Sequence, residues 1–265
     1  MINHGNNLTE RVVVELRKLG WKALISPYYV DTGRDLPREL DIICEKIIPL
    51  PWFFGEEYVY VLLRLIIECK NLTNDIYLWL DGKDKINSEK LIQKTYGIRD
   101  TFGSNVYTKE LHYGEENKVI KMFCGETEGK QSKDTENEPI FKAVNQVLNS
   151  LIFFRDRKDL GLWTEKELAA TIKGGIVSFP MVIYKTDSNI FCKNIGDQNW
   201  STYDVDYLQL ETRYAFEQKI PTGGLLRSEY FLVDLLPEEK ITKFVGYIEK
   251  CIESQLKILK FPGSL

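Results

Sequence analysis

The chain has 265 residues, of which 43% are hydrophobic and 28% charged, an ordinary balance for a globular protein of one large or two small domains. Its formal net charge of −4 argues against a protein that coats nucleic acid through a broadly basic surface, although a local basic groove is still compatible with it. Scattered cysteines and only two histidines, His4 and His112, argue against a zinc site or a disulfide framework. The polar N-terminus and short apolar runs predict a cytoplasmic protein without a membrane span.

The first third of the chain predicts one helix followed by strands. Residues 8–20 have the apolar spacing of an amphipathic helix, with Thr9 as a possible cap and Gly20 as the residue that ends it. An aromatic loop at 50–57 precedes the longest strand. The strand candidates are, in chain order, 21–30, 40–48 and 57–71. A polar loop with a proline, 33–39, separates the first two.

The remainder of the chain mixes helices and strands. The charged segment 125–138 contains few apolar residues and predicts a flexible loop, and residues 177–195 predict a β-hairpin that turns at 186–189. An amphipathic helix at 237–259 closes the chain, with Pro237 at its start. The other predicted elements are the helices 83–94, 141–154 and 164–173 and the strands 118–124, 207–216 and 229–236. This mixed order predicts an α/β or α+β layered fold.

The strand at 57–71 ends with an acid and an amine on one side. Successive side chains of a strand point to opposite faces, so Glu68 and Lys70 project together. Asp41 stands just before the apolar pair of the preceding strand and approaches Glu68 if the two strands are neighbours. Two close carboxylates repel unless a cation lies between them, and a hard cation such as Mg²⁺ prefers oxygen ligands.

Asp, Glu and Lys in one cluster indicate metal-assisted phosphodiester hydrolysis. The metal polarises a phosphate and activates a water molecule, and the lysine stabilises the developing charge. A structural reading explains the same residues: Asp41 caps a loop, and Glu68 and Lys70 form an ion pair at the end of a strand. The pattern E-x-K alone does not decide between them, because it recurs elsewhere, for instance at Glu217 and Lys219. Only its setting, at the end of a long aliphatic strand, favours a site.

In this setting the sequence resembles the PD-(D/E)XK nuclease superfamily, which has a restriction-endonuclease-like fold, and is most similar to its Mrr-like and Holliday-junction-resolvase-like branches. Those branches have an acid on a first helix, a helix-ending Gly followed by an aromatic residue, an Asp on the second strand and E-x-K on the third. The matching segments here, TERVVVELRKLGW, RELDIICEK and LIIECKN, occur in that order and cover residues 8–72. The resemblance implies a mixed central sheet flanked by helices.

The resemblance also implies roles for individual residues. Asp41 and Glu68 would be metal ligands together with the backbone carbonyl of Cys69, and Lys70 would be the catalytic lysine. Glu10 would be the acid of the first helix, with Glu15 on the same helix as the competing candidate.

The chain departs from the family pattern in two places. Leu40 stands where the family has a proline, at a position that varies readily. The separation between Asp41 and Glu68 is longer than usual and requires the segment 47–58 as a loop insertion. If that segment is not an insertion, the strand assignment is wrong and Asp41 is not part of the site.

We therefore expect a Mg²⁺- or Mn²⁺-dependent nuclease, an endonuclease on DNA, and the resemblance implies a setting of restriction, defence or repair. We expect one domain over 1–265, with the catalytic core at 1–124, the flexible loop at 125–138, and the elements that complete the fold at 139–265. The expected partners are DNA and either a second copy of the chain or a target-recognition chain. The alternative is a nucleic-acid-binding or partner-dependent subunit of the same fold with weak or no cleavage.

Overall fold

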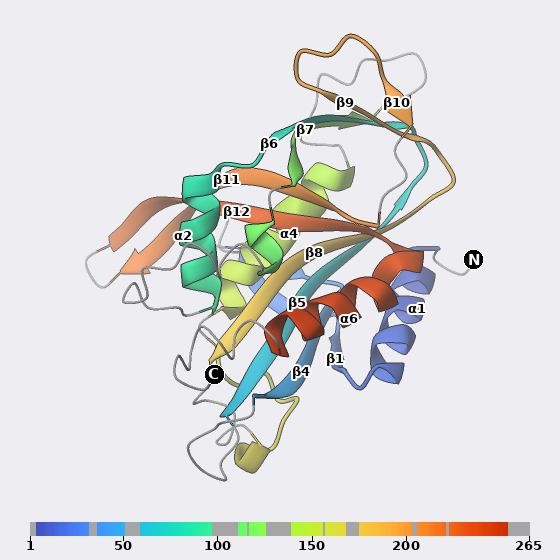
Figure 1. Cartoon of the computed structure of the whole chain (residues 1–265). Helices are drawn as coiled ribbons and strands as arrows, with labels where there is room; N and C mark the ends of the chain where they lie inside the picture. The colour runs from blue at the N-terminus through green and yellow to red at the C-terminus, as the bar shows by residue number, and fades with distance from the viewer. Residues whose placement is uncertain are drawn as a thin grey trace.

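A large mixed β-sheet with helices on both faces organises the protein (Figure 1). The structure is a computed structural model, in which the two faces of the sheet carry two separate hydrophobic cores. It describes residues 4–31, 36–50, 59–96, 111–115, 117–125, 139–155, 157–167, 175–202, 206–220 and 223–253.

Among the described residues, the sheet has ten strands. Of the five strands that begin the sheet at one edge, four run in the same direction. The second strand from that edge is antiparallel to the strands on both its sides. A separate two-stranded sheet is formed by β2 (Tyr28–Asp31) and β3 (Leu36–Glu39). The ten strands lie in the order β1 (Lys22–Ile25), β4 (Ile42–Leu50), β5 (Val59–Leu72), β8 (Ile176–Thr186), β12 (Gly223–Pro237), β11 (Leu208–Ile220), β7 (Lys118–Gly125), β6 (Ile76–Gly82), β9 (Ile190–Asn194) and β10 (Ser201–Thr202).

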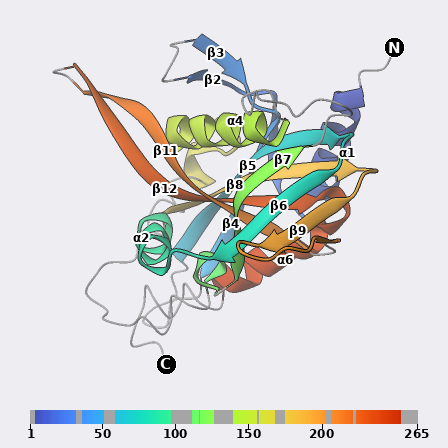
Figure 2. The same cartoon turned by 90° about the horizontal axis from the view of Figure 1, so that it is seen from above.

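Helices cover the two faces unequally. Figure 2 shows α4 on one side of the sheet and α6 on the other. On β5, alternate residues such as Val61 and Ile67 pack in a core with α1, α2 and α6, whereas Ile66 belongs to the core under α4. This alternation is the one expected for a strand buried on both faces. The helical segments are α1 (His4–Lys18), α2 (Lys85–Tyr96), α4 (Pro139–Phe154) and α6 (Ile241–Cys251), with 3₁₀ turns η2 (His112–Gly114) and η4 (Glu238–Lys240).

The first helix confirms the predicted apolar face. Leu8, Val12 and Leu16 of α1 are buried in the core. Gly20 follows the helix with a φ of 84°, a left-handed conformation that glycine adopts at low cost and other residues avoid. The prediction that Thr9 caps the helix is wrong, because α1 begins at His4 and Thr9 lies inside it.

The predicted strand 21–30 is two strands in two different sheets. Ser26, with a φ of 53°, and Pro27 break the extended chain between β1 and β2. The predicted loop 33–39 contains β3, which pairs with β2. Pro37 is compatible with that strand because each strand of a two-stranded sheet has one free edge, where a missing N–H costs no ladder bond.

The hairpin predicted at 177–195 does not form. Its two halves are β8 and β9, but β8 lies between β5 and β12 whereas β9 pairs with β6 and β10. The long antiparallel pair in the second half of the chain is instead β11 with β12, which projects beyond the sheet in Figure 2. The strands β6 and β10 were not predicted.

The predicted helices 83–94 and 141–154 are confirmed as α2 and α4. The last helix begins later than predicted, because Pro237 ends β12 and the turn η4 comes before α6. The predicted flexible loop lies outside the described residues from 126 to 138, as do 168–173 of one predicted helix and 254–259 of the last. Within the described residues, no helix has both the length and the apolar character needed to cross a membrane.

Candidate functional site at the ends of β4 and β5

The long separation between Asp41 and Glu68 is mostly strand. β4 and β5 pair without interruption from Ile42 opposite Ile67 to Leu50 opposite Val59. The predicted insertion is therefore shorter than expected, and only 51–58 lie outside the described residues. Asp41 directly precedes β4, so it keeps its place beside Glu68.

The carboxylate of Asp41 reaches across to β5. Its Oδ2 accepts a hydrogen bond from the backbone N–H of Cys69 at 2.7 Å. The backbone N–H of Asp41 in turn faces Glu68 Oε2 at 3.4 Å. Ile43, two residues after Asp41, and Ile66, two residues before Glu68, belong to the core under α4. Residues two apart in a strand point to the same face, so the two acids lie on the α4 side of the sheet.

Lys70 completes the group. Its Nζ lies 2.7 Å from Glu68 Oε1, with the lysine side chain 24% exposed and the glutamate side chain 2% exposed. The ion pair therefore has one end inside the protein and one end at the surface. The structure thus brings Asp41, Glu68 and Lys70 together, as the parity of the strand predicts.

The electrostatics of the two acids favour a proton or a cation. Burial, with the nearby charge of Asp41, raises the pKa of Glu68 to about 7, although Lys70 opposes the shift. Burial also raises the pKa of Asp41, which the N–H of Cys69 partly offsets. Burial raises the pKa of the Cys69 thiol as well, so that side chain is not a reactive thiolate.

The acids of the first helix are not brought into this group. Glu10 is exposed on α1, which packs on the face of the sheet opposite α4. Glu15 forms an ion pair with Lys18 at 2.6 Å and lines a cavity of about 650 Å³. Neither has a hydrogen bond or ion pair to Asp41, Glu68 or Lys70 within the described residues.

The donor set fits a hard divalent cation. Two carboxylates with raised pKa values offer oxygen ligands, and Mg²⁺ commonly binds one or two carboxylates and keeps several waters. In the parts of the chain that the structure describes, no group of three or more His, Cys, Asp or Glu side chains could hold a metal. Any cation here would therefore depend on Asp41, Glu68, backbone oxygens and water.

Sequence reasoning missed Tyr29, which borders the site. It is 1% exposed, and its ring packs 6.4 Å from that of Phe153 on α4. Burial, with the charges of Asp31 and Glu68 nearby, raises the pKa of Tyr29 to about 12. The signal in the sequence was weak, because a tyrosine in a strand candidate is an ordinary core residue.

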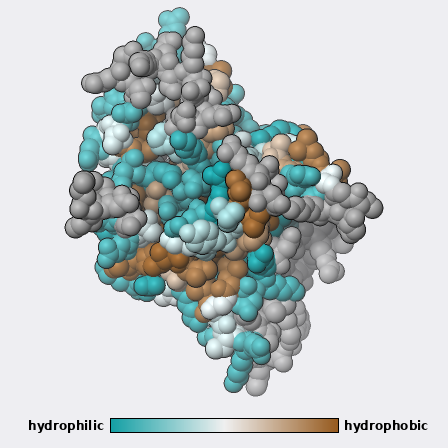
Figure 3. Space-filling view, turned by 180° about the vertical axis from the view of Figure 1, so that it is seen from behind, coloured by the Kyte–Doolittle hydropathy of each residue, from teal (hydrophilic) through white to brown (hydrophobic). Residues whose placement is uncertain are grey.

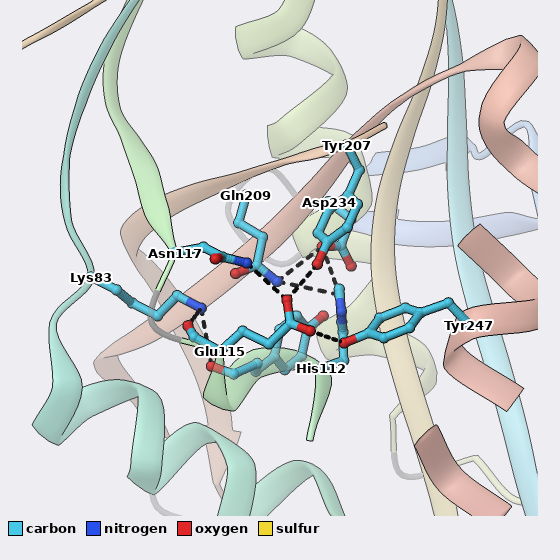
Figure 4. A network of polar contacts seen from close by, with 9 residues as sticks. Lys83, His112, Glu115, Asn117, Tyr207, Gln209, Asp234 and Tyr247 are labelled. Carbon is cyan, nitrogen blue, oxygen red and sulfur yellow. Dashed lines mark hydrogen bonds and ion pairs between the residues drawn. The ribbon is translucent and has the colours of Figure 1, made fainter. Parts of the chain in front are cut away.

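A second polar cluster lies elsewhere in the protein (Figure 4). His112 Nε2 is 2.9 Å from Asp234 Oδ1, both fully buried, and Gln209 contacts both. Lys83 donates to the backbone carbonyls of Tyr113 and Glu115, and burial lowers its pKa to about 8. The His–Asp pair itself is enclosed and supports the fold, whereas Lys83, Glu115 and Asn117 at the edge of the cluster line a small pocket of about 180 Å³.

Fold and site together define a mixed α/β protein with a carboxylate pair and a lysine at the ends of two neighbouring strands. No family model matches the chain, and comparison with curated proteins and with solved structures finds no match. A functional interpretation therefore depends on the geometry and chemistry of the site.

Proposed function

We propose that the chain is a metal-dependent nuclease of restriction-endonuclease-like fold that hydrolyses phosphodiester bonds in DNA. The observation that carries the proposal is the convergence of Asp41, Glu68 and Lys70 at the ends of β4 and β5, with both acids' pKa values raised. A structural ion pair between Glu68 and Lys70, with Asp41 capping the end of β5 through the N–H of Cys69, would account for the contacts but not for placing two buried carboxylates close together, which costs stability without a cation.

The order of elements supports the proposal. The chain runs from α1 through β1, β4 and β5, and these three strands are neighbours in the sheet in the same order. The aspartate precedes the second of them and E-x-K lies on the third. Gly20 and Trp21 end the first helix, as the resemblance implies.

Each residue has a definite task in this function. Asp41 and Glu68 would hold Mg²⁺ or Mn²⁺, joined by the backbone carbonyl of Cys69. The cation, when bound, supplies Lewis acidity and a more acidic water molecule. Lys70, at the exposed end of the group, carries an ammonium that stabilises charge on a phosphate or orients the water. Glu10 is exposed and makes no hydrogen bond or ion pair to these three residues within the described part of the chain, so the proposal gives it no task at the metal.

The partners remain part of the proposal. DNA would bind near Lys70, and a second copy of the chain or a target-recognition chain would provide further contacts. Large apolar side chains are exposed at Tyr28 (66%), Leu36 (54%) and Leu226 (76%). The surface seen from behind also mixes apolar with hydrophilic areas (Figure 3), and such apolar areas suit a protein partner.

A cleavage assay with matched lysine variants tests the proposal. The purified full chain should nick or degrade DNA with Mg²⁺ or Mn²⁺ and lose this activity in EDTA. Lys70→Ala should lower the rate by about 100-fold or more, the order found when one charge-stabilising group is removed. Lys90→Ala, which removes an exposed lysine of α2, should cleave like wild type.

Two results would overturn the proposal. One is an equal rate for wild type and Lys70→Ala on both DNA and RNA substrates. The other is cleavage that persists unchanged in EDTA. If the protein binds nucleic acid but no divalent metal supports cleavage, a binding or partner-dependent subunit becomes the better account.

A further inference from the structure

Four aromatic side chains and one lysine form an aromatic face at the far end of the sheet: Tyr77, Trp79, Phe191, Lys193 and Trp200. Tyr77 and Phe191 stack with ring centroids 5.2 Å apart and an interplanar angle of 19°. Trp200 meets the rings of Tyr77 and Trp79 edge-on, at 5.1 and 5.0 Å. The face therefore has fixed rings, whose mutual packing costs little further conformational entropy on binding.

The strand register explains why these rings point away from the core. β6 and β9 pair in parallel, with Tyr77 opposite Phe191 and Trp79 opposite Lys193. The alternate residues Leu78 and Cys192 are buried in the core under α4. The aromatic face is consequently on the side opposite α4, and none of its four rings belongs to either core cluster.

The aromatic face remains partly accessible. All five side chains are partly exposed, and Met122, opposite Trp79 on β7, is 52% exposed. In Figure 1, β6, β9 and β10 extend beyond the helices α1 and α6. A cluster of rings that served only as core would be expected to be buried, as Phe179 and Tyr96 are.

The charge on this face selects the class of ligand. Lys193 Nζ lies 4.7 Å from the ring of Trp200 and 6.0 Å from that of Trp79. Within the described residues, Lys193 has no ion pair to an acid. A complementary ligand therefore combines flat unsaturated rings with negative charge. Single-stranded nucleic acid has both, because its bases are free to stack on aromatic side chains and its phosphates attract lysine.

We infer that the aromatic face binds single-stranded nucleic acid, with bases against Trp79 and Phe191 and a phosphate near Lys193. The inference deepens the proposed nuclease function by naming an unpaired segment of the substrate, and it takes from that function only the presence of nucleic acid. Tyr77 follows Lys70 by seven residues, which limits their separation to about 25 Å along an extended chain. The two regions lie on opposite faces of the sheet, so the aromatic face is a contact separate from the one near Lys70.

The test is a binding titration in the full-length Lys70→Ala background, which prevents cleavage. A labelled oligo-dT of about 16 nucleotides, within the known range of site sizes, and a duplex of equal length are the probes. Trp79→Ala and Phe191→Ala should each weaken oligo-dT binding by about 5- to 150-fold, the range that base–aromatic stacking supports. Lys193→Glu should also weaken it, whereas Ile86→Ala, a control that changes an exposed apolar residue of α2, should not.

A second readout covers the case in which an alanine variant does not fold. Oligo-dT should quench part of the tryptophan emission, and the conservative pair Trp79→Phe with Trp200→Phe should abolish that part while thermal melting stays near wild type. Unchanged affinity in folded Trp79→Ala and Lys193→Glu, or duplex binding equal to single-strand binding, would overturn the inference. Cleavage that survives when the same substitutions are made in the wild-type background, together with lost oligo-dT binding, would leave the nuclease proposal intact and confirm the aromatic face separately.

Discussion

Glu68 is a buried carboxylate whose charged form is unfavourable without a cation and suited to binding one. Its side chain is 2% exposed and shares its surroundings with the carboxylate of Asp41. Lys70 offsets only part of the effect of burial and of the charge of Asp41, because the pKa of Glu68 still rises to about 7. A divalent cation would remove the remainder, since it stabilises both carboxylates in their charged form.

Without metal, Glu68 should make stability depend on pH. Its folded-state pKa of about 7 lies above the ordinary value of 4.5, so the folded state binds the proton more tightly than the unfolded chain. Stability is therefore highest below pH 4.5 with respect to this group and is lost as pH rises towards 7. At pH 8, Glu68→Gln should have a free energy of unfolding, measured in urea, that is higher than that of wild type by up to about 3 kcal/mol. At pH 5 the gain should be much smaller.

The control is Glu10→Gln, which replaces an exposed acid of α1 and should leave stability unchanged at both pH values. A Glu68→Gln variant that is less stable than wild type at pH 8, in EDTA, would show that the charged carboxylate of Glu68 stabilises the fold instead of destabilising it. It would then be an ordinary ion-pair partner of Lys70.

At this scale the sequence predicts the three clustered residues but not their surroundings. Strand parity alone places Glu68 with Lys70, and one assumption about neighbouring strands adds Asp41. Tyr29 escapes prediction because its contact with the site depends on the two-stranded excursion before Asp41. The exposure of Glu10 could not be foreseen either, since helix periodicity indicates a polar face but not which part of the sheet that face meets.

The β4–β5 pair carries a second buried charge pair in the same register. Arg64 lies opposite Glu45, and its Nε donates to Glu45 Oε1 at 2.7 Å, with both side chains fully buried. The guanidinium also donates to the backbone carbonyls of Phe154, at the end of α4, and Arg157. Trp163 Nε1 donates to the other oxygen of Glu45 at 2.8 Å. The pair therefore fixes the end of α4 against the sheet.

Removing one partner of this pair should destabilise the fold strongly. Arg64→Met leaves Glu45 buried and uncompensated, which costs about 3–5 kcal/mol for pairs of this kind. The double variant Arg64→Met with Glu45→Met should recover part of the loss, because no charge remains unpaired. Full recovery is not expected, since the carbonyls of Phe154 and Arg157 would still lack their donor.

Urea unfolding at 25 °C of the wild type, the single variant and the double variant measures these differences. A single variant within about 1 kcal/mol of wild type would contradict a specific role for the pair, because surface ion pairs contribute no more than that.

Local sequence patterns predict that a helix or strand exists better than they predict which strands pair with each other. Helical spacing identifies α1, α2 and α4, and aliphatic runs identify β4 and β5. The turn at 186–189 also exists, but the strands on either side of it separate into different parts of the sheet. Strand pairing depends on contacts far apart in the sequence, which a turn signal does not contain. The strand β6 was overlooked because Tyr77 and Trp79 make its outer face apolar too, which obscures the alternation.

For the whole molecule, the net charge of −4 sets the conditions for binding nucleic acid. The carboxylates of Asp41 and Glu68 repel phosphate until a cation neutralises them. Ca²⁺ binds oxygen sites, so it should tighten DNA binding relative to EDTA. Asp41→Asn should bind DNA in EDTA more tightly than wild type, by about tenfold, the change that corresponds to about 1.4 kcal/mol of removed repulsion. It should also gain less from Ca²⁺ and fail to cleave.

A binding titration at fixed salt, in EDTA and in Ca²⁺, distinguishes these outcomes. Binding by wild type that does not respond to Ca²⁺ and does not change in Asp41→Asn would place the nucleic acid away from the two carboxylates. The aromatic face on β6 and β9 could then be the main contact.

The layered α/β architecture follows from the mixed order of elements in the sequence, whereas the strand order across the sheet does not. The first three strands are neighbours in chain order, so the site could be assembled by assuming the simplest pairing. Beyond β5 the order no longer follows the chain, because β8 is the next neighbour and β6 and β7 lie on the far side of β12 and β11. The aromatic face depends on that rearrangement and was therefore invisible in the sequence.

The most direct test of the central claim is a crystal structure of the protein soaked in Mn²⁺. The account predicts anomalous density between the carboxylates of Asp41 and Glu68, with the contact between Lys70 and Glu68 Oε1 lengthened as that oxygen turns to the metal. Occupied Mn²⁺ sites elsewhere, with no density between these two carboxylates and an unchanged contact between Lys70 and Glu68, would contradict it.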